Sequence, residues 1–207
     1  MTAKDMFSHR VSILTGHYGT GKTEVSVNLA LALAAEGEQV MLADLDIVNP
    51  YFRSRERRPL LEKAGVRVIS SSQACSDADV PALPAELLTI LENREIRGIL
   101  DIGGDPVGAR VLARFQPKIV QEDYQLIFVL NANRPEVRDA ESAAAYLRSI
   151  EAVTGLTCSG LVNNTHLCGE TTPAEIRKGV ALAQEVSRQT GIPILCHTAE
   201  RRFLESL

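Results

Sequence analysis

The sequence contains no tryptophan, and aromatic residues make up only 4% of its 207 residues. Proteins that bind single-stranded nucleic acid stack the bases on aromatic side chains, so this composition disfavours a site of that kind. Basic residues are also few: 22 lysines and arginines stand against 26 acidic residues, which gives a formal net charge of −4. A nucleic-acid partner is therefore not expected, although a local basic patch is compatible with the composition.

Long apolar runs are absent as well. No stretch approaches the roughly 20 apolar residues that a membrane helix needs, so no membrane partner is expected. Residues 1–6 contain an acid and no long apolar segment, so they do not resemble a secretory signal. The sequence therefore predicts a cytoplasmic protein. The hydrophobic content of 45% is ordinary for a globular protein, and the length predicts one domain over residues 1–207.

Paired cysteines are the third absence. The four cysteines, at positions 75, 158, 168 and 196, form no C-x-x-C pair. This spacing disfavours a zinc knuckle or a compact iron–sulfur site and favours reduced, mostly buried thiols. The sequence assigns no role to any of the four.

One octapeptide organises the rest of the chain. Residues 16–23 read Gly-His-Tyr-Gly-Thr-Gly-Lys-Thr and fit G-x-x-x-x-G-K-[ST], the phosphate-binding P-loop. A short apolar strand is predicted over residues 10–14, and a helix is predicted to follow the loop as far as Ala35. Glycines with positive φ let backbone N–H groups converge on phosphate oxygens, and the start of the helix adds its unpaired N–H groups.

The predicted nucleotide-binding residues are Gly16, His17, Tyr18, Gly19, Thr20, Gly21, Lys22, Thr23 and Glu24. Within this set, Lys22 is expected to reach the β- and γ-phosphates of the nucleotide, and the Thr23 hydroxyl is expected to bind Mg²⁺.

Apolar strands and helical segments alternate along the remaining chain. Further strands are predicted over residues 39–44, 66–70, 98–101, 124–130, 157–163 and 192–196, and residues 71–84 are predicted to form a loop or lid. Strands that are apolar throughout and alternate with helices indicate a parallel sheet covered on both faces. The predicted fold is therefore α/β, a three-layer αβα P-loop NTPase with a mainly parallel sheet.

Polar residues follow several of these strands, where open α/β sheets bind their ligands. Asp101 ends a strand after two apolar residues, as in a Walker B motif, whose carboxylate supports Mg²⁺. Asp44 and Asp46 follow the second predicted strand, and the sequence does not decide between them. Asn163 ends a late strand, where contact with the base and a simple Asx-turn are nearly equal alternatives.

Together these motifs resemble the ParA/MinD group of P-loop NTPases. Residues 16–23 resemble its Walker A motif, residues 42–47 its apolar segment followed by D-x-D, and residues 101–104 its D-x-x-G segment. The resemblance implies an ATPase that binds ATP, ADP and Mg²⁺ and often forms a face-to-face homodimer around two nucleotides.

The resemblance also implies roles for individual residues. Lys22, Asp46 and Asp101 would be the catalytic residues, with Asp46 positioning the attacking water. Thr23, Asp44 and Asp101 would hold Mg²⁺. Asn163 stands where this group places an asparagine that reads adenine.

Two positions depart from the patterns that the chain resembles. His17 stands where the ParA/MinD group has a lysine that reaches the partner's phosphates, and an imidazole is a weaker phosphate clamp than an ammonium group. Three alternatives follow from this replacement. An arginine from residues 53–58 takes the place of the lysine, or ATP hydrolysis is slow, or the dimer differs from the face-to-face dimer of the group. Gly108 stands where the nitrogenase iron protein has a cluster-ligating cysteine, so a bridging cluster of that type is not expected.

Two functions fit this sequence. The first is a nucleotide-driven regulatory or metalloenzyme-maturation switch, whose client protein docks near the basic run Arg53–Arg58. The alternative is an ATP-dependent small-molecule ligase or kinase related to dethiobiotin synthetase and the cobyrinate amidation enzymes. Residues 163–166 lack the aspartate of the guanine-binding N-K-x-D motif, which favours ATP over GTP.

Overall fold

The structure is a computed structural model that describes residues 2–45, 54–70 and 85–204. Its centre is a sheet of seven strands in the order β3-β2-β4-β1-β5-β6-β7, and every neighbouring pair is parallel. The strands are β1 Val11–Thr15, β2 Val40–Leu45, β3 Arg67–Ser70, β4 Arg97–Ile102, β5 Tyr124–Leu130, β6 Cys158–Asn163 and β7 Ile194–His197. The predicted parallel α/β sheet is confirmed.

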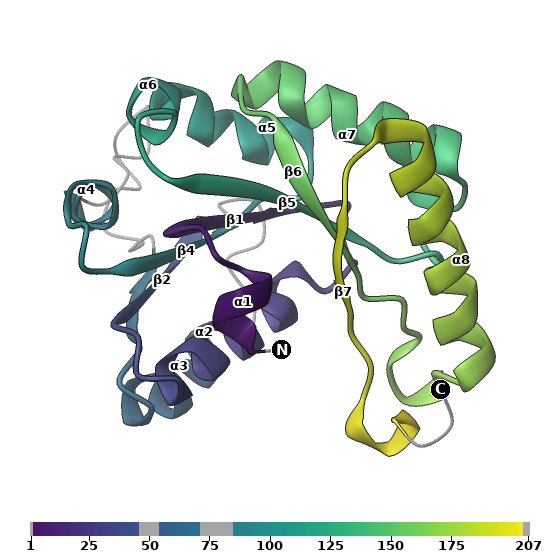
Figure 1. Cartoon of the computed structure of the whole chain (residues 1–207), viewed down its shortest axis with the longest axis horizontal. Helices are drawn as coiled ribbons and strands as arrows, with labels where there is room; N and C mark the ends of the chain where they lie inside the picture. Colours follow the sequence, from purple (N-terminus) through teal and green to yellow (C-terminus); the bar gives the residue numbers. More distant parts are fainter. Residues whose placement is uncertain (1, 46–53, 71–84, 205–207) are drawn as a thin grey trace.

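Helices cover both faces of this sheet, which completes the predicted three layers (Figure 1). Helices α1, α2 and α3 pack on one face, and the later helices pack on the other. The α-helices are α1 Ala3–Met6, α2 Lys22–Ala35, α3 Ser54–Lys63, α4 Ala85–Glu92, α5 Pro106–Ala109, α6 Gln116–Ile119, α7 Ala140–Thr154 and α8 Pro173–Thr190. Short 3₁₀ turns are η2 Arg110–Arg114, η3 Pro135–Val137, η4 Cys168–Glu170 and η5 Arg201–Phe203. None of the described helices is long and apolar enough to span a membrane.

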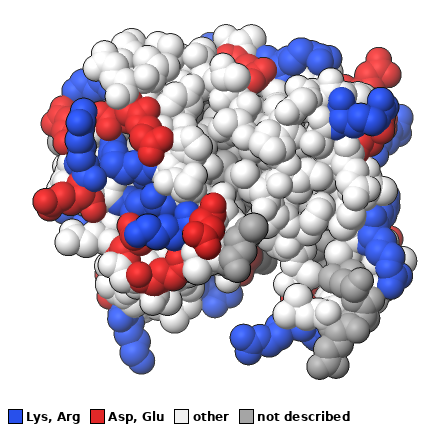
Figure 2. Space-filling model, viewed as in Figure 1, with Lys and Arg blue, Asp and Glu red and all other residues white. Residues whose placement is uncertain are grey.

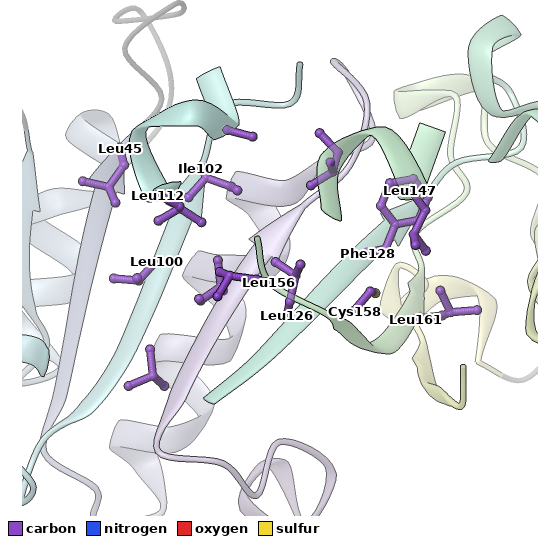
Figure 3. Close-up of a cluster of buried hydrophobic side chains, with 14 of the residues drawn as sticks. Leu45, Leu100, Ile102, Leu112, Leu126, Phe128, Leu147, Leu156, Cys158 and Leu161 are labelled. Carbon is purple, nitrogen blue, oxygen red and sulfur yellow. The ribbon is translucent and has the colours of Figure 1, made fainter. Parts of the chain in front are cut away.

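Two sets of buried apolar side chains form the core, one on each face of the sheet. Successive residues of a strand point to opposite faces, so Ile13 and Phe128 belong to one set while Leu14 and Ile127 belong to the other. Figure 3 shows the first set, in which sheet residues such as Phe128 contact helix residues such as Leu147. Central strands are thus buried on both faces, which explains their near-continuous apolar sequence.

Two features of the fold lie outside what the sequence analysis predicted. The segment after Gly104 is α5, η2 and α6 in succession, because the Phe115 N–H bonds the Leu112 carbonyl three residues back and Pro117 has no N–H to continue a helix. The four-residue helix α1 was not expected. It depends on a distant partner, since the N–H groups of Ala3 and Lys4 donate to the Glu36 carboxylate at 2.8 and 2.9 Å.

Candidate functional site: a phosphate loop and its braces

The P-loop connects β1 to α2 and carries three glycines in the positive-φ region. The φ angles are +140° at Gly16, +74° at Gly19 and +84° at Gly21. Gly21 is also the N-cap of α2 and supplies no side-chain hydrogen bond to the first turn. The N–H groups that open α2 therefore face the loop without a capping side chain, as an anion-binding helix start requires.

Atoms of β5 and of the residue after β6 occupy the space that side chains would take at two of these glycines. A Cβ on Gly16 would lie 2.4 Å from the Val129 carbonyl oxygen of β5, and a Cβ on Gly21 would lie 2.3 Å from the Asn164 Nδ2 atom. Inside the loop, the Thr20 N–H and hydroxyl both donate to the His17 carbonyl, at 3.2 and 2.9 Å. Hydrogen bonds within the loop and close contacts with its neighbours thus both hold the loop conformation.

Two carboxylates end the strands beside the loop. Asp44 on β2 and Asp101 on β4 are paired in register, and Asp101 is also paired with Leu14 on β1. Leu14 belongs to the core under α1–α3, so both aspartates are on the face of the sheet that α2 covers. Asp101 is only 1% exposed. Of the other metal-binding candidates, Thr23 lies in the first turn of α2, whereas Asp46 lies outside the described residues.

The loop after β4 lies directly against the P-loop. A Cβ on Gly104 would lie 2.7 Å from the Lys22 Nζ atom and 3.0 Å from the Tyr18 nitrogen, so this approach requires glycine. The Tyr146 hydroxyl on α7 donates to the Gly104 carbonyl at 2.5 Å. Burial, with Asp105 and Glu136 nearby, raises the pKa of Tyr146 to about 12, so its hydroxyl keeps its proton at neutral pH.

His17, at the position where the ParA/MinD group has a lysine, contacts side chains of the same chain. Its ring meets the Tyr146 ring edge-on at a centroid distance of 5.2 Å, and its Nδ1 atom lies 3.5 Å from the Glu136 carboxylate. The same Nδ1 atom lies 3.1 Å from the Tyr18 carbonyl oxygen.

Two side chains from distant loops donate to backbone carbonyls of the P-loop, and the sequence analysis predicted neither contact. The Arg134 Nε atom, in the loop after β5, donates to the Gly19 carbonyl at 2.9 Å. The Asn164 Nδ2 atom, just after β6, donates to the Thr20 carbonyl at 2.8 Å. The position of each after a predicted strand was the only local signal.

Asn163, the residue expected to read the base, is fully buried and has other partners. Its Oδ1 atom accepts hydrogen bonds from the Thr165 N–H at 3.1 Å and the Thr165 hydroxyl at 2.7 Å, and its Nδ2 atom lies 3.2 Å from the His197 Nδ1 atom. Asn163 is absent from the cavity wall, whereas the next residue, Asn164, lines it. Asn163 thus forms the hydrogen bonds of an Asx-turn, and its side chain does not line this cavity.

A cavity of about 1000 Å³ extends from the P-loop along α2. Figure 2 shows the surface hollowed between the part of the molecule formed by α1 and α2 and the part at the end of β7. Its polar end includes Lys22, Thr23, Glu24, Arg134, Asn164 and Thr198, and its apolar arm includes Met6, Phe7, Val25, Leu29 and Ala32. A second hollow, over residues 89–95, lies at the amino end of β4, away from the P-loop.

The cysteines do not form a metal site in the part of the chain that the structure describes. No group of three or more His, Cys, Asp or Glu side chains is arranged there to hold a metal ion. Burial raises the pKa of Cys158 to about 12 and that of Cys196 to about 11, so both thiols stay protonated at neutral pH, while Cys168 is exposed. Cys75 lies outside the described residues.

Comparison with known proteins finds similarity to P-loop NTPases at the start of the chain. Residues 6–55 match the family model described as ParA, NUBPL iron-transfer P-loop NTPase. The cytosolic Fe-S cluster assembly factor cfd1 of Emericella nidulans is 36% identical over 95 residues, which are 46% of this chain and 26% of that protein. The iron-sulfur cluster carrier protein of Escherichia coli K12 is 50% identical over 40 residues, 19% of this chain and 11% of that protein. The matches thus span about a quarter or less of these curated relatives.

Solved structures share the fold over most of the chain. Chloroplast FtsY from Physcomitrella patens has a TM-score of 0.59 at 19% identity, covering 89% of this chain and 56% of that one. A nucleotide-binding protein in complex with ADP from Archaeoglobus fulgidus has a TM-score of 0.53 at 17% identity, covering 98% of this chain and 86% of that one. The parallel sheet and the phosphate loop thus agree with the P-loop NTPase fold, and residues 6–55 are similar to the ParA family of iron-transfer P-loop NTPases.

Proposed function

We propose that this chain is a Mg²⁺-dependent ATPase that acts as a nucleotide-driven switch in the maturation of a metalloprotein. One observation carries the proposal: a glycine-rich phosphate loop that ends in Lys22 stands beside two carboxylates, Asp44 and Asp101, in register on neighbouring strands. Both carboxylates share the face of the sheet on which α2 begins.

These residues suit the chemistry of phosphoryl transfer, which depends mainly on positioning and charge. Lys22 and the first N–H groups of α2 would bind the phosphates. The Thr23 hydroxyl, with Asp101 and Asp44, offers the hard oxygen atoms that Mg²⁺ prefers, and the ion would neutralise phosphate charge. Asp46 remains the proposed residue for orienting the attacking water.

The base would lie at the end of the cavity lined by Asn164, Thr198 and Ala199. Asn164 replaces Asn163 in this role, because its side chain lines the cavity while Asn163 is fully buried. Its Nδ2 atom donates to the Thr20 carbonyl and its Oδ1 atom accepts from the Thr198 hydroxyl, so adenine would use the second N–H and the second lone pair of this amide.

The contact between Gly104 and the P-loop supports the switch. A γ-phosphate beside Lys22 would occupy space next to Gly104, so ATP and ADP would hold this loop differently. The client is proposed to be a metalloprotein because the matched relatives are named for iron–sulfur cluster assembly and carriage. A docking role for residues 53–58 remains a proposal, since Arg53 lies outside the described residues and Arg58 pairs with Glu62 at 3.6 Å.

Calorimetry with ATP and with GTP, each with and without Mg²⁺, tests the proposal, with light scattering on the same samples. Wild type should prefer Mg-ATP and double in mass with it, and Lys22→Ala should abolish binding because the phosphates lose their cation. Lys118→Ala is the matched control, since Lys118 forms a surface pair with Glu92 at 2.7 Å. Its affinity should stay within about twofold of wild type.

The remaining outcomes separate the parts of this proposal. No binding of either nucleotide would overturn the function as a whole. Binding of ATP without a change in mass would overturn the dimeric switch. Phosphate release that depends strictly on an added metabolite would then favour the ligase or kinase alternative.

A further inference from the structure

We propose that Arg134 is a phosphate-contacting residue, and that its guanidinium supplies the P-loop with the positive charge that His17 does not provide. This inference rests on the proposed nucleotide-binding function and adds one residue to that site. It concerns the nucleotide bound to the same subunit.

The position of Arg134 is fixed by its backbone. The residue precedes Pro135 and has the extended conformation that a following proline favours, with φ −98° and ψ 124°. Its N–H donates to the Asn131 carbonyl at 3.0 Å, and the neighbouring Ala132 N–H donates to the Thr165 hydroxyl at 3.0 Å. The loop after β5 is thus attached to the loop after β6 before any ligand binds.

The guanidinium of Arg134 lies on the P-loop itself. Besides the hydrogen bond to the Gly19 carbonyl, its atoms cover the Gly19 Cα so closely that a Cβ there would lie 2.6 Å from Cζ and 2.8 Å from Nη2. Glycine at position 19 therefore serves two purposes: it takes a positive φ angle, and it admits the arginine.

The charge of Arg134 is not neutralised within residues 2–45, 54–70 and 85–204. There its side chain forms a single hydrogen bond, through Nε, and no ion pair. The acids near it in sequence have other partners: Glu136 lies 3.5 Å from His17, and Asp139 lies 3.6 Å from Arg138. The Nη groups thus remain available to an acceptor.

Arg134 and Lys22 line the same cavity. Lys22 is only 6% exposed and Arg134 is partly buried. Two cations that share a partly buried cavity repel one another unless an anion lies between them. The polyphosphate of ATP is such an anion, and a planar guanidinium with free N–H groups suits phosphate oxygens.

Two substitutions separate this charge from the bracing of the loop. Arg134→Gln keeps an amide that can donate to the Gly19 carbonyl but removes the charge, whereas Arg134→Lys keeps the charge. Loss of a charge-assisted hydrogen bond should weaken Mg-ATP binding at least about tenfold in Arg134→Gln. Arg134→Lys should recover most of that loss, and the affinity of Arg134→Gln should depend less on salt than that of wild type.

Arg138→Gln is the matched control. It makes the same change of charge four residues away, at a surface arginine paired with Asp139, and should bind ATP within about twofold of wild type. Thermal melts followed by circular dichroism establish that each variant is folded, and Arg134→Lys keeps the test decisive if Arg134→Gln does not fold.

Three results would overturn the inference. ATP affinity of Arg134→Gln equal to that of wild type would leave Arg134 at most a brace. Equal losses in Arg134→Gln and Arg134→Lys would show that the charge is not what matters, and an equal loss in Arg138→Gln would indicate a general field effect. If wild type itself binds no nucleotide, it is the proposed function that fails.

Discussion

The two halves of the candidate site are built in different ways. The half on β1, β2 and β4 comes from short motifs, in which the P-loop glycines, Lys22 and Asp101 each follow a strand at a recognisable spacing. The half on β5, β6 and β7 comes from hydrogen bonds between distant residues: Arg134 is 115 positions from Gly19, and Asn164 is 144 positions from Thr20. Local spacing thus encodes the phosphate end of the site, and tertiary packing encodes its outer wall.

The first prediction concerns the P-loop, which belongs to the half of the site on β1, β2 and β4. Gly16→Ala should have the largest effect, a loss of about 2 kcal/mol or more in the free energy of unfolding, together with loss of ATP binding. The new methyl group would meet a backbone carbonyl of β5 at 2.4 Å, and that strand is held on both sides by β1 and β6. Chemical denaturation and calorimetry measure the two losses.

Gly37→Ala is the control that separates the steric clash at Gly16 from the cost of a positive φ angle in alanine. Gly37 also has a positive φ angle, +87°, but a Cβ there meets nothing within 4 Å. The expected loss is about 1 kcal/mol, with ATP affinity unchanged. Equal losses in unfolding free energy for the two alanine variants would contradict the predicted clash at Gly16.

The second prediction concerns the other half of the site, where two adjacent asparagines are expected to differ in their effects on stability and on ATP binding. Asn163→Ala should cost about 2 kcal/mol of stability, because it removes a buried amide and leaves the Thr165 N–H without its acceptor. Asn164→Ala should cost less than about 1 kcal/mol but weaken ATP binding about fivefold or more, because that side chain lines the cavity.

Denaturation and ATP titration of both asparagine variants provide the measurement. The reverse pattern, with ATP binding lost mainly in Asn163→Ala, would return the base contact to Asn163.

The third and smallest effect concerns pH at the end of β7. Burial lowers the pKa of His197 below its usual 6.5, and its Nδ1 atom lies 3.2 Å from the Asn163 Nδ2 donor, a contact that requires an unprotonated nitrogen. Stability from this group is therefore present above pH 6.5 and is lost as the pH falls below it. Between pH 7.5 and 5.5, the melting temperature of wild type should fall about 1–2 °C further than that of His197→Gln. Parallel curves for the two proteins would contradict this role.

Periodicity and motifs predicted most of the fold because the strands are buried on both faces and therefore apolar throughout. Segment 124–130 is β5 as expected, whereas β7 is only partly buried and begins two residues after the expected start at residue 192. Residues 106–114 form α5 and the 3₁₀ turn η2 rather than one continuous α-helix, and the apolar pattern does not distinguish these two arrangements.

The site was less predictable than the fold. A strand end indicates that polar residues gather at the sheet edge, but not that Asn164 lines the cavity while Asn163 is buried. No motif in the sequence marks Arg134, which precedes Pro135 in the loop after β5. Its contact with Gly19 depends on the order of the strands, which places β5 next to β1.

The hydrogen bond from Tyr146 to Gly104 has a consequence for every affinity that is measured on this chain. If ATP binds only molecules in which this loop has withdrawn from Lys22, the apparent dissociation constant is the intrinsic one divided by the withdrawn fraction. One net hydrogen bond changes that fraction by about two- to tenfold. On that condition, removing the Tyr146 hydroxyl would shift the apparent dissociation constant for ATP by the same factor, although Tyr146 itself lies far along the chain from the P-loop.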